Sequence, residues 1–285
     1  MKLANLAGRA TIVTDAGAVD VERASGGAFG SAVQPVFDRW AELVAAAAGF
    51  DEASAVPLDE SLLGPPVPAP RQVFAIGLNY GAHAAETGRD APPVPATFTK
   101  FPASINGPFG DIEIPAPTTD WEVELVVVIG ARADRVAGAD GWAHVAGLTV
   151  GQDISERTLQ RAAGGQFSLG KSYRGFAPIG PWVVTPDEFA DADDLALGCS
   201  LDGETVQDSR TGDLIFSVPR LVAELSAVLP LLPGDLIFTG TPAGVGAART
   251  PPRFLQPGQV LESWIEGIGT IRNRLVAPGH LIRNG

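Results

Sequence analysis

Three carboxylates stand at alternate positions in the segment Asp120-Trp-Glu-Val-Glu124, which runs directly into an apolar stretch. In a β-strand alternate side chains point to one face, so Asp120, Glu122 and Glu124 are predicted to project together. Like charges about 7 Å apart repel, and burying them without a cation costs several kcal/mol, so a compensating positive charge is expected. The alternative is an exposed strand end whose acids are solvated.

A fourth carboxylate, Asp153, follows the apolar run Val145–Val150, where a strand is predicted to end. Together with Glu122 and Glu124 it offers three oxygen ligands, with neither a thiolate nor an obligatory imidazole. Such a set suits a hard divalent cation, Mg²⁺ or Mn²⁺, with Ca²⁺ as a third candidate. Taken alone, Asp153 is interpreted as a helix cap, and Ser155 is a further candidate for the N-cap.

The chain has three histidines, and one of them, His83, stands three residues before Glu86. One turn of helix would place these two side chains side by side. A carboxylate beside an imidazole orients the ring and raises its basicity, which a pair that activates water requires. The alternative is an ordinary surface contact. His144 and His280 have no comparable surroundings.

Two Gly-rich segments carry further candidates. Lys171 lies in the first, Gly170–Pro181, where its ammonium could stabilise an enolate or a carboxylate beside a metal ion. The second, Leu232–Gly246, is predicted to form a turn, a strand and a Gly-rich loop, in which the hydroxyls of Thr239 and Thr241 and backbone amides could hold an anion. This second segment is not a P-loop, because no Gly-Lys-Ser/Thr follows it at the required spacing. A plain loop is the alternative for either segment.

The elements that position these residues are predicted to be short. Glycine and proline, 34 and 24 residues, are scattered without a period, which indicates many strands and turns. Amphipathic helices are predicted over Val33–Ala47 and from Ser217, as N-cap, to Pro230. The predicted strands after residue 70 are Val73–Ile76, Val123–Ile129, Val145–Val150, Trp182–Val184, Ala196–Leu201, Leu236–Thr239 and Val260–Ile265. We therefore expect a mostly β fold with short helices, of the α+β class.

The first 70 residues contain no motif that carries chemistry. Two short strands, Arg9–Val13 and Ala18–Val21, precede the first predicted helix, and a Pro-rich connector, Leu63–Arg71, follows it. Such connectors often separate domains. We predict a small N-terminal α/β domain over residues 1–70 and a catalytic domain over residues 71–285.

The composition narrows the class of partner. The chain has 285 residues, 45% hydrophobic, which suffices for a large core, and a net charge of −13. This charge disfavours nucleic acid and anionic membranes, so an anionic substrate would need a local counter-charge such as a metal ion. No apolar run reaches about 18 residues and no secretory signal is recognisable, so a cytoplasmic location is expected. The single cysteine, Cys199, is expected in the core.

Six motifs occur in an order that resembles the fumarylacetoacetate hydrolase family. They are Gly-Leu-Asn-Tyr-x-x-His, Asp-x-Glu-x-Glu-Leu, Asp-x-Ser-x-Arg-x-x-Gln, Gly-Lys-Ser, Pro-x-Gly-Pro-Trp and Pro-Gly-Asp-x-Ile-x-Thr-Gly-Thr-Pro. The resemblance runs from Val73 to Ile271 and is to the branch of acylpyruvases and 2-hydroxyhepta-2,4-diene-1,7-dioate isomerases. It implies a C-terminal domain of mixed β-roll type, a homodimer, and a divalent metal held by carboxylates.

The resemblance also implies a role for individual residues. The metal ligands fall on Glu122, Glu124 and Asp153; the catalytic residues are His83, Glu86 and Lys171; and the substrate-binding residues are Tyr80, Arg157, Gln160 and Thr241. Asp120 is expected to support the site without binding the metal. Two positions depart from the family pattern, Gln152 in place of Asn and Arg174 in place of Asp. Arg174 could meet a second carboxylate of a diacid substrate, or it could lie on the surface.

The implied reaction uses a 2-oxo acid with a second carbonyl group two carbons away. The metal would chelate the carboxylate and 2-oxo oxygens, His83 would activate water for attack on the distal carbonyl, and the metal and Lys171 would stabilise the enolate. We expect a hydrolase of acylpyruvate-like β-diketo acids in aromatic or sugar-acid catabolism. The alternatives are an oxaloacetate-type decarboxylase, a hydroxymuconate-like diacid isomerase, and a non-catalytic metal-dependent binder of small molecules.

Overall fold

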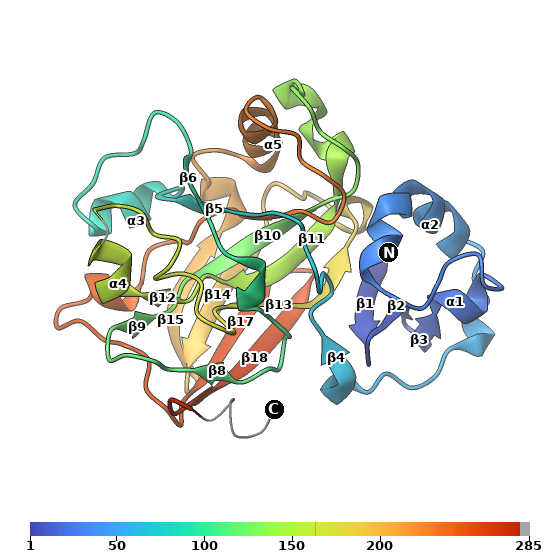
Figure 1. Ribbon diagram of the computed structural model, residues 1–285, viewed down its shortest axis with the longest axis horizontal. Helices are drawn as coiled ribbons and strands as arrows, with labels where there is room; N and C mark the ends of the chain where they lie inside the picture. Colours follow the sequence, from blue (N-terminus) through green and yellow to red (C-terminus); the bar gives the residue numbers. More distant parts are fainter. Residues whose placement is uncertain (163, 280–285) are drawn as a thin grey trace.

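The largest sheet contains eleven strands in the computed structural model, which describes residues 1–162 and 164–279. Hydrogen bonds connect nine of them in the order β3-β2-β1-β13-β11-β10-β16-β5-β6, and β4 and β7 pair with β1 and β13 (Figure 1). Their bounds are Lys2–Leu6 (β1), Arg9–Thr14 (β2), Gly17–Asp20 (β3), Leu63–Gly64 (β4), Val73–Gly77 (β5), Ala96–Thr99 (β6), Ile105–Asn106 (β7), Val123–Ile129 (β10), Val145–Gln152 (β11), Ala177–Val184 (β13) and Leu236–Phe238 (β16).

A second sheet packs against the middle of the first. Its strands follow the order β15-β14-β17-β18-β8, and β9 and β12 form a separate pair. The bounds are Ile112–Glu113 (β8), Thr119–Asp120 (β9), Ser155–Glu156 (β12), Ala196–Leu201 (β14), Glu204–Arg210 (β15), Val260–Ile265 (β17) and Gly269–Val276 (β18). Side chains of both sheets meet in one buried cluster, which includes Leu125 from β10 and Cys199 from β14. Cys199 is therefore a core residue, as predicted.

Strand β10 is buried along both faces. Val123, Leu125 and Val127 join the cluster between the sheets, whereas Val126 and Val128 belong to a second cluster on the other face. By the two-residue period of a strand, the acidic Glu124 shares the face of Val126 and Val128. Apolar packing on both faces thus holds β10 in place, while nearby polar groups must compensate the buried carboxylate of Glu124 at its start.

The helices are short, and the predicted fold class is confirmed. The α-helices of the described residues are Val21–Ala24 (α1), Trp40–Ala47 (α2), Gly81–Glu86 (α3), Arg157–Ala162 (α4) and Val218–Ser226 (α5). The 3₁₀ segments are Gln34–Arg39 (η1), Glu52–Ser54 (η2), Glu60–Leu62 (η3), Pro102–Ser104 (η4), Gly138–His144 (η5), Pro186–Glu188 (η6), Thr211–Asp213 (η7) and Gly246–Ala248 (η8). Strands dominate, as the apolar runs predicted.

Two helix predictions need correction. The α-helix predicted over Val33–Ala47 is wrong in its first half, which is the 3₁₀ segment η1. The α-helix begins only at Trp40, and a spacing of three to four residues between apolar positions suits a 3₁₀-helix as well as an α-helix. In α5, Ser217 occupies the N-cap position but its side chain makes no capping hydrogen bond, and the helix ends at Ser226, before Pro230.

The N-terminal segment extends the main sheet. Strand β1 pairs with β13, with Leu3 opposite Val183, so the sheet continues across the predicted boundary at residue 70. In Figure 1 the segment with α1, α2 and β1–β3 lies to the right of the other strands. The division into domains 1–70 and 71–285 stays a prediction, and residues 280–285 of the second lie outside the described residues.

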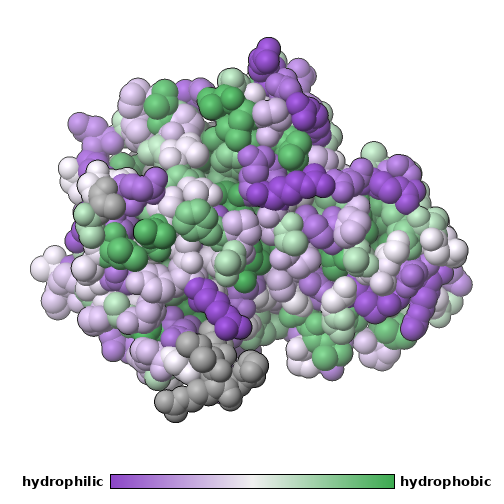
Figure 2. All heavy atoms as spheres, viewed as in Figure 1, coloured by the Kyte–Doolittle hydropathy of each residue, from purple (hydrophilic) through white to green (hydrophobic). Residues whose placement is uncertain are grey.

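Hydrophilic and hydrophobic side chains are interspersed on the face that Figure 2 shows. Large apolar side chains that are exposed, such as Val94, Leu169 and Val228, are few compared with those buried in the two core clusters. No helix among the described residues is long and apolar enough to cross a membrane.

Candidate active site

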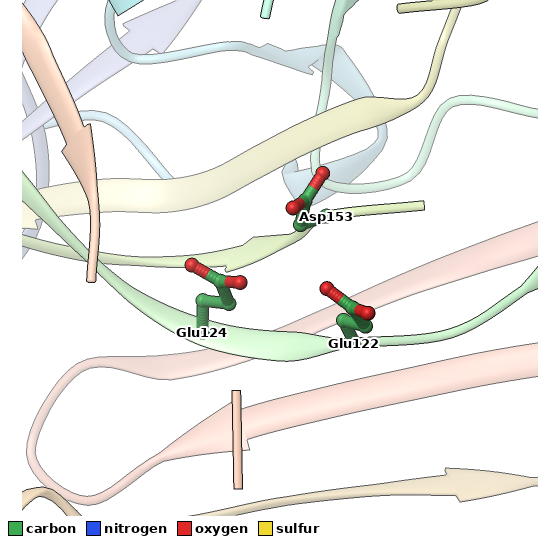
Figure 3. A group of neighbouring side chains, drawn as sticks. All are labelled: Glu122, Glu124 and Asp153. Atoms are coloured by element: carbon green, nitrogen blue, oxygen red, sulfur yellow. The ribbon is translucent and has the colours of Figure 1, made fainter. Parts of the chain in front are cut away.

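Two antiparallel strands bring the predicted metal ligands together. Strand β10 pairs with β11 so that Glu124 lies opposite Gly151, and the Asp153 amide donates to the Glu122 carbonyl at 2.9 Å. Carboxylate oxygens of Glu122, Glu124 and Asp153 all lie within 4.8 Å of one another (Figure 3). Each of these residues is at most 5% exposed. The alternative of solvated acids at a strand end is therefore wrong.

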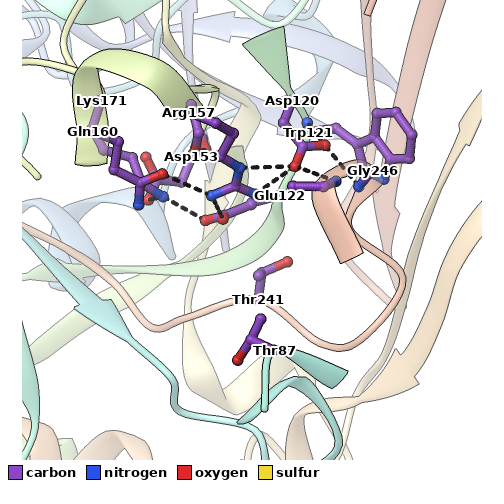
Figure 4. Close-up of polar contacts among 12 residues, drawn as sticks. Thr87, Asp120, Trp121, Glu122, Asp153, Arg157, Gln160, Lys171, Thr241 and Gly246 are labelled. Carbon is purple, nitrogen blue, oxygen red and sulfur yellow. Dashed lines mark hydrogen bonds and ion pairs between the residues drawn. The ribbon is translucent and has the colours of Figure 1, made fainter. Parts of the chain in front are cut away.

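Basic side chains surround two of these carboxylates. Lys171 Nζ lies 2.6 Å from both Glu122 Oε2 and Asp153 Oδ2, and Arg157 Nη1 lies 2.7 Å from Glu122 Oε1 (Figure 4). Burial alone would raise the pKa of Glu122, but Lys171 and Arg157 outweigh it and lower the pKa to about 2. Glu122 is therefore ionised at neutral pH.

Glu124 has no such partner. Its Oε2 accepts the Gly240 N–H at 2.7 Å, and among the described residues no basic side chain forms an ion pair with it. Burial, and then the charges of Asp153 and Glu122, raise the pKa of Glu124 well above its ordinary value. A positive charge is thus missing at this corner of the cluster. Three clustered carboxylates that lack one counter-charge fit a hard divalent cation such as Mg²⁺, Mn²⁺ or Ca²⁺.

The pair His83 and Glu86 lies on helix α3. His83 Nδ1 is 2.7 Å from Glu86 Oε1, and Glu86 Oε2 accepts the Gly244 N–H at 2.9 Å. Because a carboxylate only accepts, Nδ1 carries the proton and Nε2 is left as the basic nitrogen. His83 is 7% exposed and lines a cavity, so the alternative of an ordinary surface contact is wrong.

A cavity of about 500 Å³ joins these groups. Of the predicted site residues, it is lined by His83, Glu86, Glu122, Asp153, Arg157, Gln160, Lys171 and Thr241. Helices α3 and α4, which supply several of them, lie on the same side of the molecule in Figure 1. Residues from five separate segments of the sequence therefore face one space large enough for a small organic acid.

Tyr80 does not reach this space. It is 1% exposed, does not line the cavity, and its hydroxyl has no hydrogen-bond partner among the described residues. Burial, and then the nearby charge of Glu124, raise the pKa of its phenol. The structure therefore does not bring Tyr80 to a substrate in the cavity, contrary to the predicted role.

Arg157 and Asp120 form a supporting pair. Arg157 Nε and Nη2 lie 2.8 and 2.6 Å from Asp120 Oδ2, and Asp120 also accepts the N–H groups of Gly246 and Ala247. Figure 4 shows Asp120 turned toward Arg157 and Gly246. The position of Asp120 agrees with a supporting residue, whereas the guanidinium of Arg157 is already engaged by Asp120 and Glu122.

Gln160 and Thr241 also have partners within the protein. Gln160 Oε1 accepts from Arg157 Nη1 at 3.1 Å, while Thr241 Oγ1 donates to the Val123 carbonyl and accepts from Gln207 Nε2. Gln207 also accepts the Val123 N–H, so it fixes both Thr241 and the start of β10. The substrate-binding roles of Arg157, Gln160 and Thr241 stay predictions.

The two departures from the family pattern have different surroundings. Gln152 is buried, accepts the Glu122 N–H at 2.8 Å and donates to Ser263 Oγ at 2.9 Å, so it holds the backbone of a predicted ligand. Arg174 is exposed and does not line the cavity. It therefore does not meet a substrate bound there.

Ser155 does not cap a helix. It lies in β12, paired with Asp120, and the capping role belongs to Glu156, whose carboxylate accepts the N–H groups of Thr158 and Leu159. The sequence prediction of Ser155 as an N-cap is wrong because the chain forms one more strand pair before α4 begins at Arg157.

Residues Gly165–Ser172 match the pattern Gly-x-x-x-x-Gly-Lys-Ser of phosphate-binding loops. Such a loop joins a strand to the N-terminus of a helix, whereas this segment follows α4 and precedes β13. Its lysine, Lys171, points to two carboxylates. The segment is therefore not a nucleotide-binding loop.

Sequence analysis missed Lys100, which is 0% exposed. Its ammonium lies 2.7 Å from Asp153 Oδ1 and also donates to the Lys171 carbonyl. Burial lowers the pKa of Lys100, although Asp153 opposes this effect. The chain has three lysines, Lys2, Lys100 and Lys171, and two of them are buried against the same aspartate. A lysine that directly follows a short strand in such a lysine-poor chain is the signal that could have found it.

We expect Lys100→Met to destabilise the metal-free protein by about 3 kcal/mol, because it removes one partner of a buried ion pair. The melting temperature in EDTA should fall by roughly 6 °C or more. Saturating Mg²⁺ should reduce the difference in melting temperature between the variant and the wild type, since the cation supplies positive charge to Asp153. Lys2→Met, at the third lysine, is the control. An equal loss of stability with and without Mg²⁺ would show that Lys100 does not act through Asp153.

The fold places a His–Glu pair and two members of a buried acidic triad, Glu122 and Asp153, at one cavity. This arrangement is typical of a metal-dependent enzyme. A family model described as fumarylacetoacetate (FAA) hydrolase C-terminal matches residues 72–276. The chain belongs to the fumarylacetoacetate hydrolase family, as the motifs indicated.

Relatives within this family carry different activities. A 2,4-didehydro-3-deoxy-L-rhamnonate hydrolase from Sphingomonas sp. is 42% identical over 245 residues, 84% of this chain and 86% of the relative. A mitochondrial oxaloacetate tautomerase from Rattus norvegicus is 42% identical over 213 residues, 74% of this chain and 68% of the relative. Family membership therefore does not select one reaction.

Among solved structures, the fold resembles a fumarylpyruvate hydrolase from Pseudomonas aeruginosa in complex with Mn²⁺ and pyruvate. The TM-score is 0.66 and the sequences are 32% identical, and the match covers 73% of this chain and 90% of that one.

Proposed function

We propose that this protein is a divalent-metal-dependent hydrolase that cleaves a carbon–carbon bond in acylpyruvate-like β-diketo acids. The observation that carries the proposal is the His83–Glu86 pair, which lines the same cavity as Glu122 and Asp153 of the acidic triad. The hydrolases among the relatives, one of them with Mn²⁺ and pyruvate, support it. A water-activating pair has no use in a protein that only binds a small molecule.

Glu122, Glu124 and Asp153 would hold the cation. When bound, it supplies Lewis-acid polarisation of the 2-oxo group and stabilises negative charge on that oxygen. The buried ammonium of Lys171 lies beside the same carboxylates and adds positive charge where a 2-oxo acid would bind. These groups favour the electron distribution of an enolate over that of the ketone.

His83 would remove a proton from water at Nε2, while Glu86 holds Nδ1 and stabilises the imidazolium. The water oxygen bonds to the distal carbonyl carbon, and the bond between that carbon and C3 of the 2-oxo acid breaks. Its electron pair stays with the 2-oxo acid fragment as an enolate, which then takes up a proton at C3. The products are a carboxylic acid and a 2-oxo acid.

Oxaloacetate tautomerisation is the second candidate, because relatives 42% identical to this chain carry that name. It needs the same stabilised enolate but no attack by water. Oxaloacetate decarboxylation and the isomerisation of a hydroxymuconate-like diacid share this requirement. The His83–Glu86 pair favours hydrolysis, which needs an activated water, over decarboxylation, which needs no base. A tautomerase or an isomerase would use the same pair to transfer a proton.

The test is an assay of the purified protein with Mg²⁺ or Mn²⁺ on acetylpyruvate, fumarylpyruvate, a 2,4-dioxo sugar acid and oxaloacetate. We expect hydrolysis of at least one β-diketo acid, with release of a 2-oxo acid. Conversion of oxaloacetate without cleavage of any β-diketo acid would overturn the proposal in favour of the second candidate.

Lys171→Met is expected to lower kcat by on the order of 10²-fold, because the charge is needed most when the enolate forms. Mg²⁺ should bind the variant at least as tightly as the wild type, since an ammonium that shares carboxylate oxygens with the cation is removed. Steady-state kinetics and calorimetric Mg²⁺ titration measure both effects. A rise in KM alone would reassign Lys171 to binding of the substrate carboxylate.

We further propose a homodimer in the cytoplasm, the arrangement and location expected from the sequence. Analytical ultracentrifugation tests the first, and a sedimentation mass of one chain would contradict it.

A further inference from the structure

The cavity contains more positive charge than its own acids require. Among the described residues eleven arginines lie within 4.0 Å of a carboxylate oxygen and five do not. Three of these five, Arg89, Arg161 and Arg249, line the cavity. In a chain with a net charge of −13, this concentration of unpaired arginines needs a reason.

The acids that line the cavity do not supply the missing partners. Glu86 pairs with His83, Glu122 pairs with Arg157 and Lys171, and Asp153 pairs with two lysines. A divalent cation in the triad would add further positive charge. No carboxylate that lines the cavity is therefore left to pair with these arginines, and an anionic ligand would supply the counter-charge that the half-buried Arg249 lacks.

Arg249 is the most firmly held of the three. It is half-buried, its guanidinium lies 5.5 Å from the centre of the Trp121 ring, and its Nη2 donates to the carbonyls of Val206 and Gly244 at 2.9 and 3.4 Å. Its Nε is buried without a hydrogen-bond partner. Carbonyl groups and an aromatic ring orient the guanidinium but leave its charge uncompensated. Arg89 and Arg161 are exposed, at the opening of the cavity.

One residue links Arg249 to the water-activating pair. The Gly244 N–H binds Glu86 Oε2, and the Gly244 carbonyl accepts from Arg249. The unpaired charge therefore lies near His83 and Glu86. In the proposed reaction this is where the acyl part of the substrate is attacked.

We infer that Arg249 binds a second anionic group, a carboxylate on the acyl part of the substrate, and that Arg89 and Arg161 attract it at the opening. The substrate class is then a dicarboxylic acylpyruvate and not one with a neutral acyl chain. The assignment to the acyl part rests on the proposed function, whereas the existence of an anion site does not.

Binding of two non-cleavable ligands tests the site independently of turnover. 2-Oxoheptanedioate and 2-oxoheptanoate have equal chain length and lack the 4-carbonyl group, so neither can be hydrolysed by this reaction; they differ in the terminal carboxylate. With saturating Mg²⁺, calorimetry should show tighter binding of the dianion by on the order of 10- to 100-fold, the worth of one charge-assisted contact.

Arg249→Gln should reduce this preference to less than about threefold while 2-oxoheptanoate binds as before, and Arg249→Lys should keep part of it. The matched control is Arg174→Gln, an exposed arginine without a carboxylate partner that does not line the cavity; it should keep the whole preference. Equal affinities in the wild type, a preference that survives Arg249→Gln, or equal weakening of both ligands would each overturn the inference.

Turnover of the matched substrates 2,4-dioxoheptanedioate and 2,4-dioxoheptanoate separates the two proposals. We expect kcat/KM to favour the dianion, and Arg249→Gln to remove that advantage. If neither compound is cleaved while the binding preference depends on Arg249, the proposed hydrolysis fails and the anion site stands. If both are cleaved equally well, the assignment of the acyl carboxylate to Arg249 is wrong.

Discussion

Glu124→Gln is expected to abolish binding of Mg²⁺ at millimolar concentrations and to lower kcat/KM by on the order of 10³-fold or more. Glu124 is the one member of the triad that lacks a basic partner in the protein, so its charge is the one left for the cation. The amide keeps the size of the side chain and removes that charge. Calorimetric titration and steady-state assays measure the two losses.

The same variant should not lose stability in the absence of metal, although it loses metal binding and activity. Because the folded-state pKa of Glu124 is raised, its ionisation at neutral pH opposes folding of the metal-free protein. Glu124→Gln is therefore expected to be at least as stable as the wild type in EDTA, and its melting temperature should not rise with Mg²⁺. In the wild type, Mg²⁺ should raise the melting temperature.

Asp235→Asn is the matched control, because Asp235 is also fully buried but binds the amides of Gln72 and Leu232, away from the triad. This variant should lose stability yet keep the response to Mg²⁺. Full activity of the wild type after exhaustive EDTA treatment, or an unchanged Mg²⁺ response in Glu124→Gln, would rule out the triad as the metal site.

Local patterns predicted the elements whose own residues determine them. The strand Val123–Ile129 was predicted with its observed bounds because every residue in it except Glu124 is apolar, which suits a strand buried on both faces. The segment after Val33 was mispredicted because the spacing of its apolar residues does not distinguish a 3₁₀-helix from an α-helix. Sequence patterns therefore predicted where apolar residues pack but not how the helix begins.

The polar environment of the site was harder to predict from the sequence, because the residues in contact are far apart along the chain. Lys100 meets Asp153 across 53 residues, and the Arg249 side chain contacts the carbonyl of Val206 across 43. Neither lysine nor arginine has a local spacing that indicates such a partner. The triad was predictable because Glu122 and Glu124 are two residues apart where a strand begins, and the alternation of side chains in extended backbone places both on one face.

The arrangement of charge also explains why a metal centre can be buried here. Lys100, Lys171 and Arg157 compensate Asp153, Glu122 and Asp120, so the fold can bury these acids before any cation binds. Glu124 alone lacks a basic partner, and burial raises its pKa. The protein thus holds a preformed set of oxygen ligands at the cost of one unfavourable ionisation, and binding a cation removes that cost.

His83→Ala should separate hydrolysis from the reactions that need no attacking water. General-base catalysis contributes about 10²- to 10⁴-fold, so hydrolysis of a β-diketo acid should fall by this factor, while Mg²⁺ affinity stays unchanged because His83 binds no triad oxygen. Oxaloacetate decarboxylation should fall much less, since it depends on stabilisation of the enolate. Glu86→Gln should give a smaller loss than His83→Ala, because the imidazole remains but is less basic and less well oriented.

The comparison requires kcat for both substrates in the wild type and in each variant, with His144→Ala as the control at a histidine that does not line the cavity. A fall in hydrolysis alone assigns His83 to the attacking water. An equal fall in both reactions would mean that His83 transfers a proton common to both, as a tautomerase requires. Hydrolysis that proceeds unchanged without His83 would show that water is activated elsewhere, and the role of the pair would then be confined to holding Gly244 and its loop.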